Sequence, residues 1–147
     1  MGEPKPRPFL DTNVLISGLY SAGGPPAQLL RAHGAGDITI VVSRQVLEEL
    51  VVAIQRKAPA LLALLHHFLT ASPPEVCPAP AAQEVKEAAS CVNLSDAPIL
   101  AAARKSGADC LVTGDSILAR KAARCAGVTV TTPAAYVQLA RLGSLFH

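Results

Sequence analysis

The sequence predicts an α/β fold, a three-layer α/β/α arrangement around a central parallel β-sheet of about four to five strands. Short apolar segments rich in β-branched residues alternate with longer segments of helical periodicity along the whole chain. Strands that alternate with helices pair in parallel, so helices are expected on both faces of the sheet. The 147 residues suit one domain with one core.

Composition and cysteine usage narrow the class of protein. Half of the residues are apolar, and a net charge of +2 neither predicts nor excludes a nucleic-acid partner. The four cysteines, at 77, 91, 110 and 125, lack metal-ligand spacing, so we expect buried thiols in a reducing compartment. No apolar run approaches the roughly twenty residues of a membrane span. A soluble, cytoplasmic protein without membrane contact is expected.

The N-terminal region predicts an arm followed by the first strand. Prolines at 4, 6 and 8 indicate an extended arm over residues 1–8, with a single domain over 9–147. Phe9 and Leu10 are the secure members of a strand that ends at Asp11. A loop over 21–24 precedes a helix that begins at Pro25-Pro26, because proline is tolerated in the first turn.

The next strand and two helices follow from apolar patterning. Residues 38–42 are apolar or β-branched, which is typical of a parallel strand buried on both faces. Ser43 is a good N-cap for the next helix, in which Glu48 and Glu49 flank the apolar face on opposite sides. Periodicity therefore does not decide which glutamate points into a crevice. A helix over Leu61–Leu69 is apolar over most of its circumference, which suggests a homodimer.

The C-terminal half repeats the alternation. Ser95 is a candidate N-cap for a helix that begins at Asp96, and Thr132 with Pro133 begins the last helix. The remaining elements expected here are a short edge strand around Val76, a polar helix over 82–89, strands over 110–113 and 128–131, and a helix over 116–126.

Carboxylates occur where these elements would bring them together. Asp11 and Asp115 each follow an apolar strand, and parallel strands end at the same edge of a sheet. Asp96 lies in the first turn of its helix. Each acid also has a structural explanation, as an N-cap, a turn residue or a solvated helix flank. If three or four of them converge, they require a cation, and Mg²⁺ or Mn²⁺ prefers oxygen ligands. Such a site activates water for attack at phosphorus.

Four short motifs in order resemble the PIN-domain nucleases, especially the VapC-like toxins. They are Leu10–Leu15, Glu49-Leu50, Ser95–Ala103 and Val112–Asp115. The resemblance implies a Mg²⁺- or Mn²⁺-dependent endoribonuclease and a small antitoxin partner. It implies metal ligation and catalysis by Asp11, Glu49, Asp96 and Asp115, with support from Thr12, Asn13 and Thr113. Asn93, Ser95 and Ser116 stand where relatives often have acids, so we expect one tightly held ion.

Basic residues near helix ends suit the helix dipole. A subset near the crevice would contact RNA phosphates, and Arg44 and Arg120 are the candidates for this role.

Two other functions fit parts of the sequence. A catalytically inactive PIN-like module would bind RNA or protein. A haloacid-dehalogenase-type phosphatase would use Asp11-Thr12-Asn13, although Asn13 replaces the second acid of that motif.

Overall fold

The five strands form one parallel sheet in the order β3-β2-β1-β4-β5. A computed structural model describes residues 5–125 and 127–140 of the chain. Leu10 pairs with Val112, and Val112 pairs with Thr131, so β1, β4 and β5 end at one edge. The expected fold class is confirmed. The strands are β1 (Pro8–Leu10), β2 (Val41–Ser43), β3 (Glu75–Cys77), β4 (Cys110–Val112) and β5 (Thr129–Thr131).

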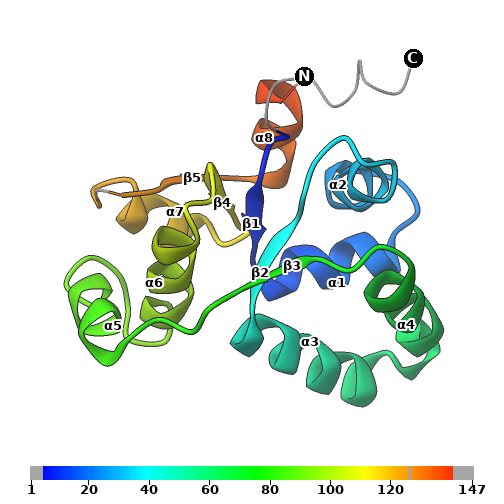
Figure 1. The fold of residues 1–147 in the computed structure, drawn as a ribbon, viewed down its shortest axis with the longest axis horizontal. Helices are drawn as coiled ribbons and strands as arrows, with labels where there is room; N and C mark the ends of the chain where they lie inside the picture. The colour runs from blue at the N-terminus through cyan, green and yellow to red at the C-terminus, as the bar shows by residue number, and fades with distance from the viewer. Residues whose placement is uncertain (1–4, 126, 141–147) are drawn as a thin grey trace.

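Helices cover both sides of the sheet (Figure 1). Helices α1 to α4 lie on one side, α5 to α7 lie on the other, and α8 packs beside α2. A 3₁₀ turn over Pro59–Leu61 joins α3 to α4. The helices are α1 (Thr12–Tyr20), α2 (Pro25–Gly34), α3 (Arg44–Lys57), α4 (Leu62–Ala71), α5 (Ala82–Ala88), α6 (Ala97–Ser106), α7 (Ser116–Ala122) and α8 (Pro133–Leu139).

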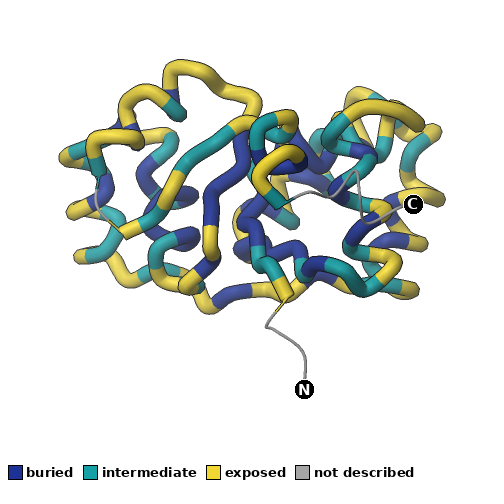
Figure 2. The backbone as a smooth tube through the Cα atoms, turned by 90° about the horizontal axis from the view of Figure 1, so that it is seen from above, coloured by how far each residue is buried: buried dark blue, intermediate teal, exposed yellow. Residues whose placement is uncertain are grey.

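The core lies on the central strands and on the helix faces turned toward them (Figure 2). Phe9, Leu10 and Leu111 are completely buried. Helix α6 contacts β2, β3 and β4, and its Ala101–Ala103 segment is buried. Small side chains here let the helix backbone approach the sheet closely, which suits a chain poor in aromatic residues.

Helix starts follow the expected capping signals at two positions. The Ser43 hydroxyl accepts the Val46 N–H at the start of α3, and the Thr132 hydroxyl accepts the Ala135 N–H at the start of α8. At α6 the expectation is wrong, because Asp96 rather than Ser95 is the N-cap. Helix α7 ends at Ala122, earlier than expected, and Ala126 lies outside the described residues.

The β2 strand differs from the expected range of 38–42. It begins at Val41, because the backbone N–H groups before it bond elsewhere: Thr39 to the Pro6 carbonyl and Ile40 to His33 Nδ1. Ile38 and Ile40 are nevertheless buried in the core. The short edge strand expected around Val76 is present as β3.

Part of the proline-rich N-terminal segment is tied to the sheet. The Arg7 side chain pairs with Glu75 of β3, and the Arg7 backbone exchanges hydrogen bonds with Asp109. Strand β1 begins at Pro8. Residues 1–4 of the expected arm and residues 141–147 of the expected domain lie outside the described residues. Among the helices described, none has the length and apolar character needed to cross a membrane.

Candidate active site

The site is centred on the carboxyl ends of β1 and β4. Asp11 follows β1, and its backbone N–H bonds to the Val112 carbonyl at the end of β4. Asp115 follows β4 by three residues and is the N-cap of α7. The parallel pairing of these two strands therefore brings Asp11 and Asp115 to the same edge of the sheet.

Thr113 connects these two aspartates. It is completely buried, and its hydroxyl donates a 3.0 Å hydrogen bond to Asp11 Oδ2. The Thr113 hydroxyl oxygen in turn accepts the Asp115 N–H at 3.1 Å. One hydroxyl thus contacts both the Asp11 carboxylate and the turn that carries Asp115.

Thr12 connects Asp11 to helix α3. Its backbone N–H donates to Asp11 Oδ1 at 2.7 Å, and its hydroxyl donates to Glu49 Oε2 at 3.0 Å. Glu49 Oε1 accepts a hydrogen bond from Gln45. Glu48 instead faces Arg44, at 3.5 Å between Oε1 and Nε. The structure therefore places Glu49, and not Glu48, beside Asp11.

Asp96 differs from the other two aspartates in how its carboxylate is used. Asp11 and Asp115 both act as N-caps through their side chains, since Asp115 Oδ1 accepts the Ile117 and Leu118 N–H groups. Asp96 is the N-cap residue of α6, but its side chain makes no capping hydrogen bond. Within the described residues, no hydrogen bond holds this carboxylate. It is the acid of the site with the greatest freedom to bind a ligand.

The acids influence one another electrostatically. Burial raises the pKa of Asp11, as do the charges of Asp96 and Glu49, whereas the hydrogen bonds from Thr113 and Thr12 lower it. Burial and the charge of Asp115 raise the pKa of Asp96, and Lys121 opposes this shift. The charges of Glu49 and Asp96 thus act on Asp11, and the charge of Asp115 acts on Asp96. Asn13, expected to support the site, is exposed in the first turn of α1 and takes no part in the hydrogen bonds described above.

The donor atoms of this neighbourhood fit a hard cation. All of them are carboxylate or hydroxyl oxygens, and clustered like charges are stabilised by a divalent ion. The described side chains do not form a ready metal site, because no three of the His, Cys, Asp or Glu residues among them are arranged as ligands. Ligation would require the carboxylates to move together, for which Asp96 is suited because its side chain makes no capping hydrogen bond.

A basic cavity of about 740 Å³ lies next to this cluster. Lys121 reaches from α7 to Asn93, which precedes α6, with 2.7 Å between Nζ and Oδ1. Two lining residues contact the acids, because the Asn93 carbonyl accepts the Asp96 N–H and the Ile117 N–H donates to Asp115 Oδ1, so the cavity borders these two acids. Arg120 is one of its lining residues, whereas Arg44 is exposed beside Glu48 on α3. The lining comprises Ser90, Cys91, Val92, Asn93, Ile117, Arg120, Lys121 and Arg124.

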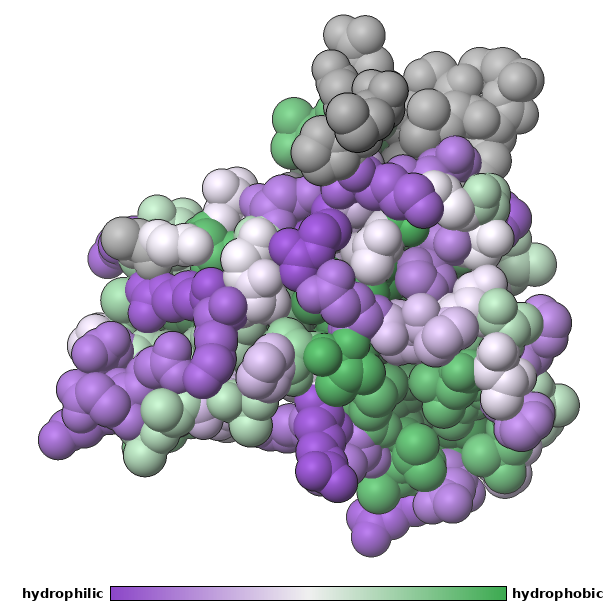
Figure 3. Space-filling model, in the orientation of Figure 1, coloured by the Kyte–Doolittle hydropathy of each residue, from purple (hydrophilic) through white to green (hydrophobic). Residues whose placement is uncertain are grey.

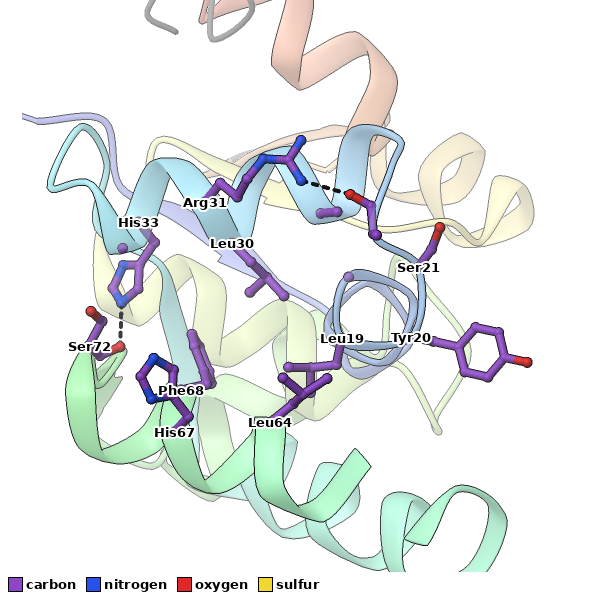
Figure 4. Close-up of a pocket in the computed structure, with 14 residues that line it drawn as sticks. Leu19, Tyr20, Ser21, Leu30, Arg31, His33, Leu64, His67, Phe68 and Ser72 are labelled. Carbon is purple, nitrogen blue, oxygen red and sulfur yellow. Dashed lines mark hydrogen bonds between the residues drawn. The ribbon is translucent and has the colours of Figure 1, made fainter. Parts of the chain in front are cut away.

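A second cavity, of about 500 Å³, is largely apolar and lies between α1, α2 and α4 (Figure 4). Leu19, Leu30 and Leu64 point into it from these three helices. It opens beside a broad apolar area over α1, α3 and α4 (Figure 3). Leu62 and Leu64 of α4 are 39% and 50% exposed, so this helix is not fully covered by its own chain. We call this cavity the apolar groove.

Comparisons with known proteins place this geometry in a family. The family model described as PIN domain matches residues 7–116. Solved structures with a similar fold include VapBC2 from Rickettsia felis bound to a promoter DNA fragment (TM-score 0.65, 20% identity, 86% of this chain and 98% of that one). Another is DNA-bound VapBC from Salmonella typhimurium (TM-score 0.65, 18% identity, 87% and 98%). FitAcB from Neisseria gonorrhoeae is also similar (TM-score 0.59, 20% identity, 86% and 97%). A comparison with curated proteins gives no significant match.

Proposed function

This chain belongs to the PIN-domain family, and on that premise we propose that it is a Mg²⁺- or Mn²⁺-dependent endoribonuclease, the toxin of a toxin–antitoxin pair. The observation that carries the proposal is the hydrogen-bond network in which Thr12 joins Asp11 to Glu49 and Thr113 joins Asp11 to the turn of Asp115, with Asp96 at the start of α6 near them. Family membership favours this function over the haloacid-dehalogenase-type phosphatase.

The proposed ligands of the ion are the four acids. A bound Mg²⁺ or Mn²⁺ supplies a more acidic water and stabilises charge that develops at phosphorus. The chain contributes orientation: Thr113 and Thr12 hold the Asp11 carboxylate, and Thr12 also holds Glu49. Asp96 has no competing hydrogen bond among the described residues, so its oxygens are available to a ligand.

The basic cavity supports RNA as the substrate. Arg120, Lys121 and Arg124 line it, and it borders Asp96 through Asn93, whose carbonyl accepts the Asp96 N–H. A phosphodiester chain entering the acidic cluster requires cations beside it, because the acids alone would repel the phosphates. We propose that these three residues hold the phosphates that flank the cut. Arg44 stays a weaker candidate because it faces Glu48.

The apolar groove is the proposed docking site of an antitoxin. VapBC2 and VapBC share this fold, and the resemblance to VapC-like toxins implies a small antitoxin partner. The groove is open and apolar, and Leu64 on its wall is half exposed. Co-expression with the product of a neighbouring small gene, followed by co-purification, tests the proposal. Loss of that complex in Leu64→Glu would support it, whereas a stable homodimer that Leu64→Glu disrupts would assign the same surface to a second copy of this chain.

A catalytically inactive binding module remains the second candidate. The observation in its favour is that no three described side chains already form a metal site. The discriminating experiment is incubation of a mixed RNA panel with Mn²⁺, Mg²⁺ or EDTA, comparing wild type with Asp96→Asn. Metal-dependent cleavage that disappears in Asp96→Asn supports the nuclease. Absence of both metal binding and cleavage in the wild type would support the binding module.

We also propose that the protein is a soluble toxin that acts on RNA in the cytoplasm. We further propose that residues 9–147 form a single domain. The sheet includes Pro8 and is tied to Arg7, so the functional domain is proposed to need the end of the N-terminal arm as well. Deletion of residues 1–8 should reduce stability, because it removes Arg7 and Pro8.

A further inference from the structure

The basic cavity is larger than a site for one phosphate group needs to be. Its volume is about 740 Å³, within the range of roughly 300–1,000 Å³ that is typical of pockets enclosing a whole small ligand. One part of its lining is cationic and consists of Arg120 and Lys121 of α7 with Arg124 just after that helix. The other part includes residues 90–93, which precede α6. The cations therefore account for only part of the cavity.

The three cations of the cavity are available to an anion. The ion pairs of the described residues involve Arg7, Arg44 and Lys105, so none of the three cavity cations is used in one. Phosphate suits a group of arginine and lysine side chains, because its oxygens accept several charge-assisted hydrogen bonds at once. The cationic part of the lining thus fits the phosphate of a nucleotide.

Ile117 gives the cavity an apolar wall between the cations and the acids. Its side chain lines the cavity and is 53% exposed. It lies two residues after Asp115 and one helical turn before Lys121, on the same face of α7 as that lysine. A flat, uncharged ring gains free energy by covering such an apolar side chain, whereas a phosphate group does not. The wall therefore fits the base of a nucleotide.

Asn93 adds a hydrogen-bond donor beside this wall. Its Oδ1 accepts Lys121 Nζ at 2.7 Å, and because a lysine ammonium group only donates, the amide oxygen must be the atom that faces it. The amide NH₂ group therefore points away from Lys121. Among the described residues, none accepts a hydrogen bond from this NH₂ group. It is free to donate to a carbonyl oxygen or a ring nitrogen of a base.

The cavity lies directly beside two acids of the candidate active site. The Asn93 carbonyl accepts the Asp96 N–H at 2.9 Å, and the Ile117 N–H donates to Asp115 Oδ1 at 2.9 Å. Two lining residues are thus bonded to two of the proposed metal ligands. A nucleotide held in the cavity would lie next to the phosphodiester at which those ligands act.

We propose that the basic cavity binds one whole nucleotide of the substrate RNA, with its phosphate on the cations and its base against Ile117 and the Asn93 amide. The base in the cavity would then contribute to the choice of the bond that is cut. That consequence rests on the proposed nuclease function, whereas the binding of a nucleotide does not. A free mononucleotide has the same chemistry as a nucleotide of the chain, so the test includes both.

Titration of the full-length protein in EDTA, followed by amide NMR, tests binding without cleavage. The probes are the four ribonucleoside 5′-monophosphates, their nucleosides and inorganic phosphate. We expect at least one monophosphate to bind several-fold more tightly than its nucleoside and than inorganic phosphate, with shifted amide signals in residues 90–93 and 117–124. Equal affinities for the monophosphates and inorganic phosphate would overturn the proposal, as would shifts confined to other segments.

Two variants separate the base from the phosphate. Ile117→Thr should lower the affinity for the best monophosphate several-fold and leave that for inorganic phosphate unchanged, whereas Arg120→Gln should weaken both. Val76→Thr is the matched control, because Val76 is also β-branched and 49% exposed, but lies on β3 at the edge of the sheet opposite to β5. It should bind like the wild type. An equal loss in both threonine variants would overturn the assignment of the base to Ile117.

Cleavage of RNA in Mn²⁺ separates this inference from the proposed function. If the wild type cleaves, Ile117→Thr should change the frequencies of the bases beside the cut, which are read by mapping the fragment ends. Unchanged frequencies would overturn the binding of an RNA nucleotide in the cavity. If the wild type binds monophosphates as expected but cleaves no RNA, the nuclease proposal fails and the cavity is a site for a nucleotide alone.

Discussion

Thr113 and Asp11, 102 positions apart in the sequence, are joined by a hydrogen bond from a completely buried hydroxyl to a carboxylate oxygen. The bond connects the end of β4 to the end of β1. Because the same hydroxyl accepts the Asp115 N–H, it sets the positions of two acids with one side chain. Thr12 does the same for Asp11 and Glu49. The site is therefore organised by two threonines, with the acids arranged around them.

Thr113→Val should weaken both stability and catalysis. The substitution keeps the shape of the side chain but removes a partner from Asp11 and from the Asp115 N–H. We expect a loss of about 1–3 kcal/mol in the free energy of unfolding, measured by urea denaturation. Activity should fall by roughly 10–100-fold, as is typical when a residue that orients a metal ligand is lost.

The same variant should shift the pH dependence. The Thr113 hydrogen bond lowers the pKa of Asp11, so its removal should raise that pKa. The acidic limb of the pH–rate profile should then move to higher pH. Thr113→Ser keeps the hydroxyl and should restore the wild-type profile. An unchanged pH–rate profile in Thr113→Val would show that Thr113 does not affect the ionisation that sets the acidic limb.

Asp96→Asn should stabilise the protein in EDTA at neutral pH. Folding raises the pKa of Asp96, so the protonated carboxyl stabilises the folded state. This stabilisation is complete below the pKa of the unfolded chain and is lost as the pH rises through the pKa of the folded state. Asparagine carries no charge at any of these pH values, so the variant avoids the loss, and the substitution removes no capping hydrogen bond. The difference in Tm between variant and wild type should be positive at pH 7 and disappear near pH 3. A lower Tm for the variant at pH 7 would contradict this electrostatic account.

Gly18→Ala should destabilise the protein although alanine favours helices. A Cβ at Gly18 would lie 2.7 Å from Leu30 Cδ1 and 2.9 Å from the Pro26 carbonyl oxygen, where α1 meets α2. We expect a cost of about 1–3 kcal/mol by thermal or urea denaturation, with weaker antitoxin binding because both helices line the apolar groove. Gly34→Ala in α2 is the matched control. Its Cβ meets nothing within 4 Å, so it should be neutral or stabilise by about 0.4–1 kcal/mol. Equal effects of the two substitutions would contradict the packing argument.

Arg120→Ala should weaken RNA binding and reduce its salt dependence. Arg120 lines the basic cavity, and each phosphate contact contributes about 0.7 to the slope of log affinity against log salt for single strands. Fluorescence anisotropy with labelled RNA in Ca²⁺ or EDTA measures both quantities without cleavage. Arg44→Ala is the comparison, and we expect a smaller effect because Arg44 faces Glu48. If Arg44→Ala lost more RNA affinity than Arg120→Ala, the RNA would instead be expected to bind along α3.

The alternation of strands and helices could be predicted from the sequence because it depends on local patterns. The positions of Asp11 and Asp115 follow from that alternation, since parallel strands end together. The choice between Glu48 and Glu49 could not be made from periodicity, because it depends on a hydrogen bond from Thr12 on another helix. Family resemblance points to Glu49, and in the structure Glu49 is the glutamate that accepts the Thr12 hydroxyl.

Features that depend on tertiary contacts were beyond sequence reasoning. The start of β2 at Val41 depends on His33 and Pro6, which bond the preceding N–H groups. The use of Asp96 rather than Ser95 as the N-cap of α6 was also missed. The sequence also predicts four buried thiols, whereas Cys91 and Cys125 are only partly buried in the folded chain.

The measurement that tests the central claim most directly is cleavage of one RNA in Mn²⁺ by wild type, Glu49→Gln and Glu48→Gln. The two glutamates are neighbours on α3, but only Glu49 contacts the Asp11 and Thr12 network. We predict that Glu49→Gln lowers the cleavage rate by at least about 100-fold, because losing a metal ligand should reduce activity at least as much as losing a residue that orients one. Glu48→Gln should cleave at the wild-type rate. Equal rates in the two variants, or a greater loss in Glu48→Gln, would contradict the proposed site.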